Sequence, residues 1–189
     1  RDLVRSRGLG DVYKRQDSIV TFGNFEEVET FNDSILDMRW MTLRAPATEL
    51  YSLTQTPGYL TLKCADVSST EKDTPAFISR RMQHHKYECT TRVLFEPSDE
   101  QEAAGLLLFK DETHQYFMGV NRNKNGKCIT LWQVGETGSN ILAEQPIAND
   151  VNVTDLKVVS LGTVYDFYYS VGNGQWNSLC KNVDAHYLS

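Results

Sequence analysis

Three features that mark other protein classes are scarce or missing in this 189-residue sequence. No segment repeats apolar residues at positions i, i+3, i+4 and i+7 over three turns, so no amphipathic helix is predicted. No apolar run approaches the roughly 20 residues that span a bilayer, and we therefore expect no membrane partner. The cysteines are isolated and lack the Cys-x-x-Cys spacing of zinc sites, which argues against metal binding and leaves their disulfide state open. They are Cys64, Cys89, Cys128 and Cys180.

Basic residues are in the minority. The chain carries 19 Lys and Arg against 25 Asp and Glu, which gives a formal net charge of −6 at pH 7. A surface that binds nucleic acid needs the opposite balance, because clustered Lys and Arg make the contacts to phosphate. An acidic surface also repels anionic membranes. We therefore expect no nucleic acid partner, and expect instead an uncharged ligand such as a sugar, or another protein.

Residues 1–16 differ in character from the rest of the chain. They contain five Lys and Arg and two Asp, with neither strand nor helix periodicity. A secretory signal would need a continuous apolar segment after the basic start, and this segment has none. The run Asp11–Gln16 (DVYKRQ) resembles the translation of a transposon sequencing adaptor, a common read-through in assembled environmental sequence. We interpret residues 1–16 as an unstructured artefact and 17–24 as a lead-in, and we expect the true N-terminus to be missing.

Alternating hydrophobicity characterises the rest of the chain. From Tyr87 to Phe95 every second residue belongs on one face, the period of two that is typical of a half-buried strand. The run Ala103–Phe109 is apolar on both faces, which predicts a central strand covered on both sides. About ten short strands separated by turns, without helices, predict an all-β fold, an antiparallel two-sheet β-sandwich. Further strands are expected at 114–120, 128–134, 155–161, 164–171 and 176–180, with a turn at 135–140.

Five phrases of the sequence resemble one protein family. In chain order they are WMTLRAP (40–46), SLTQTPGYLTL (52–62), ISRRMQH (78–84), EAAGL (102–106) and VDAHYLS (183–189). Together they resemble the C-terminal concanavalin-A-like β-sandwich of family 43 glycoside hydrolases, which are β-xylosidases and α-L-arabinofuranosidases. The resemblance covers residues 25–189 and implies a jelly-roll topology for the sandwich.

The resemblance also implies a function. In such enzymes an N-terminal five-bladed β-propeller carries the catalytic carboxylates, and the sandwich packs against it and helps to close the sugar pocket. We therefore expect a non-catalytic accessory module of an enzyme that acts on xylo-oligosaccharides or arabinoxylan. Its expected partner is the propeller of the same parent chain, and xylo-oligosaccharide is its candidate ligand. A secreted or periplasmic location would suit such an enzyme, and the N-terminus that would decide it is expected to be missing.

The family's sandwich continues into a Gly- and Phe-rich segment that contributes to the pocket. This sequence stops before that segment, so we expect the module of residues 25–189 to be short of a strand at its C-terminal end. The choice between xylose and arabinose is expected to depend on the propeller, and it cannot be read from this chain.

No catalytic residue is assigned from the sequence. Inverting glycoside hydrolysis needs two carboxylates about 6.5–9.5 Å apart across the sugar. The acidic clusters at 99–102 and 111–112 lie in predicted turns, and Glu88, Asp155 and Asp166 have no acidic partner two residues away. His84 and His85 point to opposite faces if they are adjacent in a strand, so they cannot easily chelate one ion. We expect no catalytic site, metal or cofactor here, although the parent protein is expected to be a glycoside hydrolase.

Candidates for contact with the propeller come from two of the shared phrases. Alternation places Arg80 and Arg81 on opposite faces of an expected strand, so one of them faces inward or faces a partner. An internal ion pair and a contact across the seam to the propeller both remain open. The interface candidates are Trp40, Arg44, Arg80, Arg81, Gln83 and His84.

Aromatic residues on the predicted strands supply candidates for sugar contact. In Val164–Val171 rings fall on both faces, so one set belongs to the core and the other can form a stacking platform. Core packing or a covered interface would explain the same rings. The candidates, Tyr116, Trp132, Tyr168 and Trp176, also support an alternative function, an autonomous carbohydrate-binding module with aromatics on its concave face.

Overall fold

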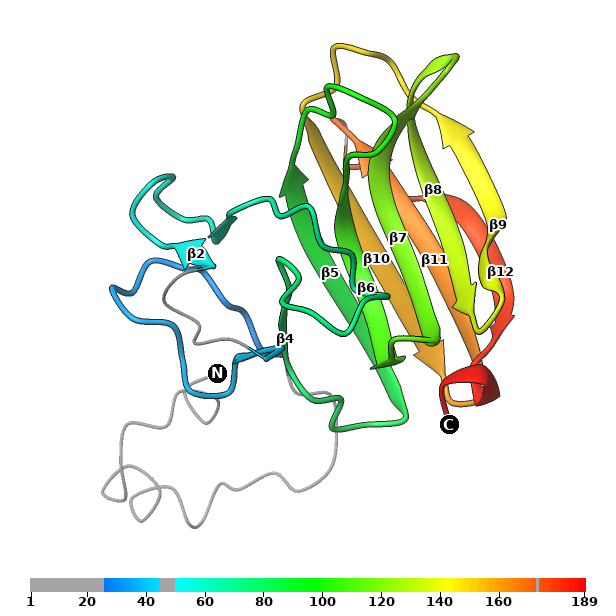
Figure 1. The fold of residues 1–189 in the computed structure, drawn as a ribbon, viewed down its shortest axis with the longest axis horizontal. Helices are drawn as coiled ribbons and strands as arrows, with labels where there is room; N and C mark the ends of the chain where they lie inside the picture. Colours follow the sequence, from blue (N-terminus) through cyan, green and yellow to red (C-terminus); the bar gives the residue numbers. More distant parts are fainter. Residues whose placement is uncertain (1–25, 45–49, 173) are drawn as a thin grey trace.

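Two four-stranded antiparallel sheets face each other in a computed structural model of the chain, which describes residues 26–44, 50–172 and 174–189 (Figure 1). The interpretations of residues 1–16 and 17–24 fall outside the described residues. One sheet has the order β6-β7-β8-β9, with β6 (Ala103–Asp111), β7 (His114–Asn123), β8 (Gly126–Gly135) and β9 (Gly138–Pro146). The other has the order β12-β11-β10-β5, with β5 (Lys86–Leu94), β10 (Val153–Leu161), β11 (Val164–Val171) and β12 (Asn177–Asp184). The predicted antiparallel two-sheet β-sandwich is confirmed.

Apolar residues on alternate positions of the central strands fill the space between the sheets. On β7, Tyr116, Met118 and Val120 point inward, and on β10 Leu156 and Val158 do so. Burying such side chains supplies most of the favourable free energy of folding. The hydroxyl of Tyr116, whose ring lies in the core, donates to the Asp184 carbonyl at 2.9 Å. A 3-10 helix, η3 (His186–Leu188), closes one end of the sandwich.

A less regular segment precedes β5 and lies beside the sandwich, where Figure 1 shows β2 and β4. It contains two small antiparallel pairs, each of two-residue strands. These are β1 (Met41–Thr42) with β4 (Ile78–Ser79), and β2 (Tyr51–Ser52) with β3 (Thr61–Leu62). The segment contacts the sandwich through Phe77, whose ring lies 5.3 Å from that of Phe109 on β6.

Three predictions about strands are corrected by the structure. The run Ala103–Phe109 lies in β6, which is at the edge of its sheet and not at the predicted central position. Residues 138–146 form the strand β9. The sequence predicted a turn at 135–140 and no strand after it. The strand expected around Arg80 ends at Ser79, so strict alternation does not extend to Arg80 and Arg81.

The sequence places Cys64, Cys89 and Cys128 within predicted strands, where a free cysteine usually behaves as a small buried hydrophobe. All four are free, and Cys128 on β8 is buried as expected. Cys64 and Cys89 are exposed, because Cys64 lies outside the short β3 and Cys89 lies on the edge strand β5.

A buried lysine predicts how stability depends on pH. Lys127 on β8 is almost fully buried, and its ammonium donates to Glu96 and to the Val151 carbonyl. The hydrogen bond from Lys127, with a smaller effect of Arg122, lowers the pKa of Glu96 from its ordinary 4.5. A carboxyl whose pKa is depressed by folding stabilises the fold above its unfolded pKa, and this stabilisation disappears as the pH falls through the folded pKa.

We therefore expect the Tm difference between wild type and Lys127→Met to be largest at neutral pH and to shrink below about pH 4.5. Thermal unfolding from pH 7 to pH 3 measures it. Lys124→Met, in the exposed β7–β8 turn, is the control and should give a small difference at every pH. A Lys127→Met difference that does not change with pH would contradict this account of the pair.

Candidate domain interface and sugar-binding residues

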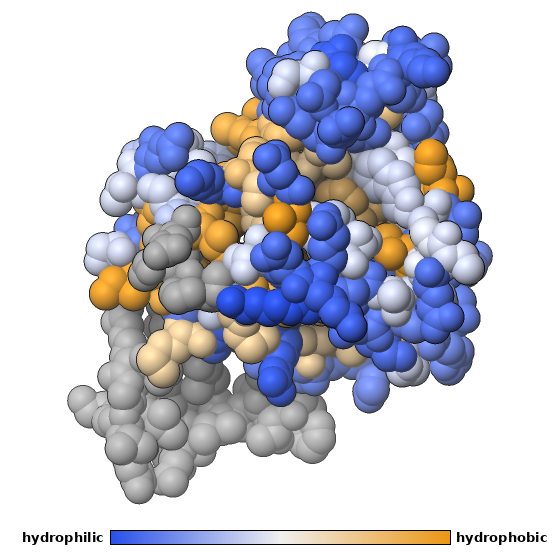
Figure 2. Space-filling view, in the orientation of Figure 1, coloured by the Kyte–Doolittle hydropathy of each residue, from blue (hydrophilic) through white to orange (hydrophobic). Residues whose placement is uncertain are grey.

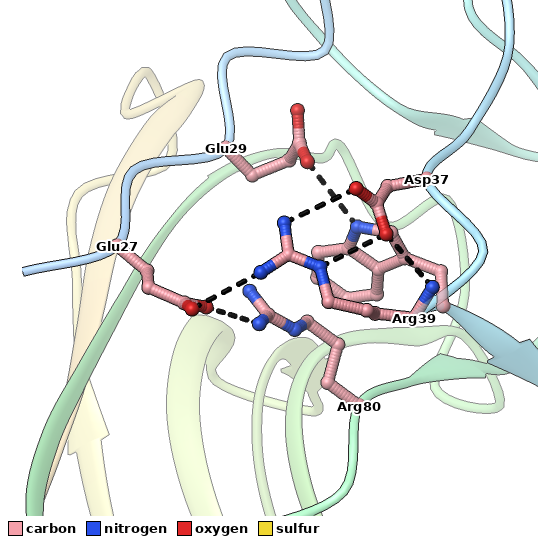
Figure 3. Close-up of polar contacts among 6 residues, drawn as sticks. Glu27, Glu29, Asp37, Arg39 and Arg80 are labelled. Carbon is pink, nitrogen blue, oxygen red and sulfur yellow. Dashed lines mark hydrogen bonds and ion pairs between the residues drawn. The ribbon is translucent and has the colours of Figure 1, made fainter. Parts of the chain in front are cut away.

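Five charged side chains gather around Trp40, next to the pair of strands β1 and β4 (Figure 3). Glu27 lies between two arginines. It accepts from Arg39 Nη1 at 3.0 Å and forms an ion pair with Arg80. Arg39 also binds Asp37 through Nε at 2.9 Å, and this hydrogen bond lowers the pKa of Asp37. The cluster therefore ties residues 27–40 to the segment that leads into β5.

Trp40 makes contacts through its ring and a hydrogen bond through its indole nitrogen. The guanidinium carbon of Arg80 lies 5.5 Å from the Trp40 ring centroid, and the Phe31 ring lies 5.7 Å away. Its Nε1 donates to Glu29 Oε2 at 3.3 Å. Of the two explanations considered for the arginine pair, the internal ion pair therefore applies to Arg80.

Different roles for neighbouring arginines lead to a prediction. Arg80→Ala removes the pair with Glu27 and the contact with Trp40, so we expect it to lower the free energy of unfolding by about 1 kcal/mol. Arg81→Ala removes an exposed side chain and should stay within about 0.5 kcal/mol of wild type. Urea denaturation of both variants measures the difference. Equal losses for the two would contradict the assignment of Arg80 as the internal residue.

Arg44 likewise makes its contacts within the module. Its Nη1 donates to the carbonyls of Glu71 at 3.1 Å and Asp73 at 2.8 Å, and it forms an ion pair with Glu112 in the β6–β7 turn. Its φ of +63° lies in the left-handed region, which non-glycine residues seldom adopt. Arg44 therefore links the N-terminal segment to the sandwich.

The other interface candidates remain at the surface. Arg81, Gln83 and His84 are all exposed, on the irregular stretch between β4 and β5. Met82 of this stretch is also an exposed apolar side chain (58%), as are Val28 (67%), Ile35 (78%) and Met38 (96%) of the N-terminal segment. Large apolar side chains gathered in this way often mark interaction sites.

The four sugar-contact candidates lie in three different places. Tyr116 is in the core with 1% of its surface exposed, which leaves no ring face for a sugar and does not fit the predicted contact. Trp132 stacks on Phe117 at 5.4 Å on the outer face of the β6–β9 sheet. Tyr168 and Trp176 belong to the outer face of the other sheet, where Lys157 lies over both rings. Only these last two are brought together.

Acidic residues on turns serve local structure. Asp111 is hydrogen-bonded to His114 at 2.9 Å, and this bond is the main reason that its pKa falls to about 2. Hydrogen bonds from Ser98 lower the pKa of Glu102. A general acid in glycoside hydrolysis needs a raised pKa, so both shifts are in the wrong direction for that role. Among the described residues, no three His, Cys, Asp or Glu side chains form a set that could hold a metal ion. The same residues contain no helix long and apolar enough to cross a membrane.

The sequence analysis did not identify the ion-pair partners of Arg80 and Arg92. Glu27 binds Arg80 from 53 positions away, and Arg92 binds Asp155 from 63 positions away. Opposite charges at such separations give no signal without the strand register that brings them together. In contrast, Trp40 could be found because it lies in a phrase shared with a known family.

Comparison with known protein families gives a match over nearly all the described residues. The family model described as "Beta xylosidase C-terminal Concanavalin A-like domain" matches residues 28–189. A curated beta-xylosidase of Bacillus subtilis is 31% identical over 173 residues, which cover 87% of this chain and 32% of the relative. A non-reducing end alpha-L-arabinofuranosidase of Bacteroides ovatus is 32% identical over 103 residues, 54% of this chain and 19% of that protein.

Solved structures share the fold. A xylan beta-1,4-xylosidase from Bacillus halodurans superposes with a TM-score of 0.80 at 24% identity, over 90% of this chain and 34% of that one. The chain thus spans about a third of the length of the beta-xylosidases that it matches. It belongs to the C-terminal concanavalin A-like domain family of family 43 beta-xylosidases, as the resemblance of the five phrases predicted.

Proposed function

We propose that this chain is the accessory β-sandwich of a family 43 glycoside hydrolase that acts on xylo-oligosaccharides or arabinoxylan. In this role it packs against a catalytic β-propeller of the same parent chain and helps to close the active site. The main support is the exposed apolar surface around the Glu27 cluster. The length of the relatives adds to it, since two thirds of each beta-xylosidase lies outside the matched part.

The exposed apolar residues belong to one surface. Val28 follows Glu27, Met38 precedes Arg39, and Met82 is two residues after Arg80, so the ion pairs around Glu27 hold all three near one another. Figure 2 shows apolar residues interrupting the polar surface on the left, where Figure 1 places β2 and β4. Arg81, Gln83 and His84 supply exposed polar groups beside them. An apolar centre with polar groups at its rim is the usual anatomy of a protein interface.

The ion pairs explain why this surface would keep its shape without a partner. Arg39 and Arg80 hold Glu27 from two sides, and Arg44 fastens the same segment to β6–β7. A surface that is already ordered loses less conformational entropy on docking. We therefore assign Arg44, Arg80 and Trp40 to supporting the interface, and Met38, Arg81 and Met82 to contacting the propeller.

A chimera tests this proposal. The C-terminal third of the Bacillus subtilis beta-xylosidase is replaced by residues 26–189 of this chain, and hydrolysis of a chromogenic xyloside is compared with that of the truncated enzyme. We expect the chimera to be more active than the truncated enzyme and to unfold in one cooperative transition. A chimera that is no more active, with two separate transitions, would contradict the accessory role.

Charges placed in the surface refine the test. Met38→Asp with Met82→Asp should reduce the activity of the chimera about tenfold, because two desolvated carboxylates would face the propeller. Leu161→Asp, at an exposed apolar position at the end of β10, is the matched control and should leave the activity unchanged. The isolated chain should keep its Tm with either change, since all three positions are exposed.

A further inference from the structure

A second surface lies on the outer face of the β12-β11-β10-β5 sheet. There the structure has an open hollow of about 490 Å³, lined by Gly58, Tyr59, Thr90, Arg92, Asp155 and Trp176. Its size is within the usual range of small-ligand sites. We call it the outer-face hollow.

Strand register explains its floor. Arg92 on β5 lies opposite Asp155 on β10, and Asp155 lies opposite Ser170 on β11. In the next row on the same face, Thr90 lies opposite Lys157, and Lys157 lies opposite Tyr168. Three strands therefore supply a continuous floor of side chains that carry hydrogen-bonding groups.

The charged groups of the floor are fixed and balanced. Arg92 binds Asp155 through two parallel hydrogen bonds, Nε to Oδ1 at 2.7 Å and Nη2 to Oδ2 at 3.0 Å. The Lys157 ammonium lies 3.6 Å from Glu88. Lys181 near the Tyr168 ring and Asp166, which accepts from the Tyr168 hydroxyl, add one charge of each sign. Three cations and three carboxylates give no net charge, which suits neither an anionic nor a cationic ligand. Donors and acceptors held side by side instead suit the hydroxyl groups of an uncharged sugar.

Aromatic rings form the walls. Trp176, just before β12, lies on one side, and Tyr59, from the turn between β2 and β3, lies on another. Lys157 Nζ is 4.3 Å from the centroid of the Trp176 ring, so the ammonium holds one face of the indole and fixes its orientation. Tyr168 is covered differently, since Lys157 and Lys181 each lie 5.5 Å from its ring. Of the two predicted sugar contacts on this face, Trp176 therefore lines the hollow and Tyr168 supports its floor.

One polar group at this face has no partner. The hydroxyl of Ser170, opposite Asp155, is buried and makes no hydrogen bond among the described residues. An unsatisfied buried hydroxyl is unfavourable and uncommon in proteins.

We infer that the outer-face hollow binds one or two rings of a neutral oligosaccharide, with Trp176 and Tyr59 against the rings and Thr90, Arg92 and Asp155 on the hydroxyls. Its choice of xylo-oligosaccharide rests on the proposed function. The residues proposed to contact the propeller, Met38, Arg81 and Met82, do not line the hollow, so the module would hold substrate chains while it remains attached to the catalytic domain.

Calorimetric titration of the whole chain with xylohexaose tests the inference. We expect saturable binding, and Trp176→Ala should weaken it about tenfold or more through loss of the stacking surface. Asp155→Asn keeps the size of the side chain but replaces a carboxylate oxygen that can accept from a sugar hydroxyl with an amide group. It should also weaken the binding of xylohexaose. Trp132→Ala is the matched control on the opposite outer face and should bind like wild type. Trigalacturonate, an anionic sugar, should bind to none of them.

Each outcome separates the two proposals. Circular dichroism shows whether every variant is folded. If Trp176→Ala does not fold, the binding of xylohexaose to Asp155→Asn decides between the outcomes. The sugar site would be overturned if wild type does not bind xylohexaose, or if Trp176→Ala and Asp155→Asn both bind it as tightly as wild type does. Neither outcome would affect the chimera result. Loss of binding in Trp132→Ala alone would move the site to the β6–β9 face and also overturn this inference.

Discussion

Gly105→Ala is expected to lower the free energy of unfolding by about 3 kcal/mol, a large share of the roughly 5–15 kcal/mol that stabilises a typical domain. Gly105 on β6 lies directly opposite Gly119 on β7. A Cβ at Gly105 would lie 2.1 Å from the Met118 carbonyl oxygen and 2.6 Å from the Gly119 Cα. Both are backbone atoms, so relief requires the two strands to separate and to lose ladder hydrogen bonds. Chemical denaturation measures the loss.

Gly119→Ala is the matched control. Its Cβ would lie 2.8 Å from the end of the Phe117 ring, a side chain that can turn away, and 3.4 Å from the Ala104 carbonyl oxygen. We expect a clearly smaller loss of stability than at Gly105. If Gly105→Ala is as stable as wild type, the close approach of β6 and β7 described here is wrong.

Phe167→Ala is expected to cost about 3–5 kcal/mol, because it removes a large ring from the centre of the sandwich and leaves a cavity. Phe167 has no exposed surface, and its ring lies at 6.2 Å from Tyr116 and 6.4 Å from Tyr165 in edge-on contacts. Thermal unfolding should show a large drop in Tm, or no cooperative transition at all.

The adjacent residue provides the comparison. Tyr168 is on the same strand but on the outer face, so Tyr168→Ala should cost about 1 kcal/mol or less. A similar loss for the two variants would contradict the alternation of β11 between core and surface. The pair therefore tests the register of the strand with one measurement.

The sequence reveals the parts of the fold in which strands lie between clear turns. β5 was predicted because apolar residues recur at every second position, and the strands expected at 114–120, 155–161 and 164–171 correspond to β7, β10 and β11. β6 was placed in the middle of a sheet because both its faces are apolar. In the structure its outer face is covered by Phe77 of the preceding segment, a contact across 32 positions that periodicity does not report.

The candidate sites were predictable to a lesser degree. Trp40, Arg80 and Trp176 were named from shared phrases and aromatic content, but their roles depend on groups distant in sequence. Glu27 makes Arg80 internal, and Asp155 with Lys157 makes Trp176 a wall of a hollow. The roles of Arg80 and Trp176 depend on the strand register and on the path of the irregular segments. Both are determined by the energy of the whole fold and not by the local sequence.

The pairing of β5 with β10 has a consequence for how the chain is made. The four strands of the β6–β9 sheet are consecutive, so each pairs with a neighbour as soon as it is synthesised. β5 instead requires β10, and the bonded residues Arg92 and Asp155 are 63 positions apart. At roughly 5–20 residues per second, a ribosome takes about 3–13 s to supply that partner. During this interval the meander can form while Tyr87 and Val93 stay uncovered, which makes β5 the strand most exposed to chaperones on the nascent chain.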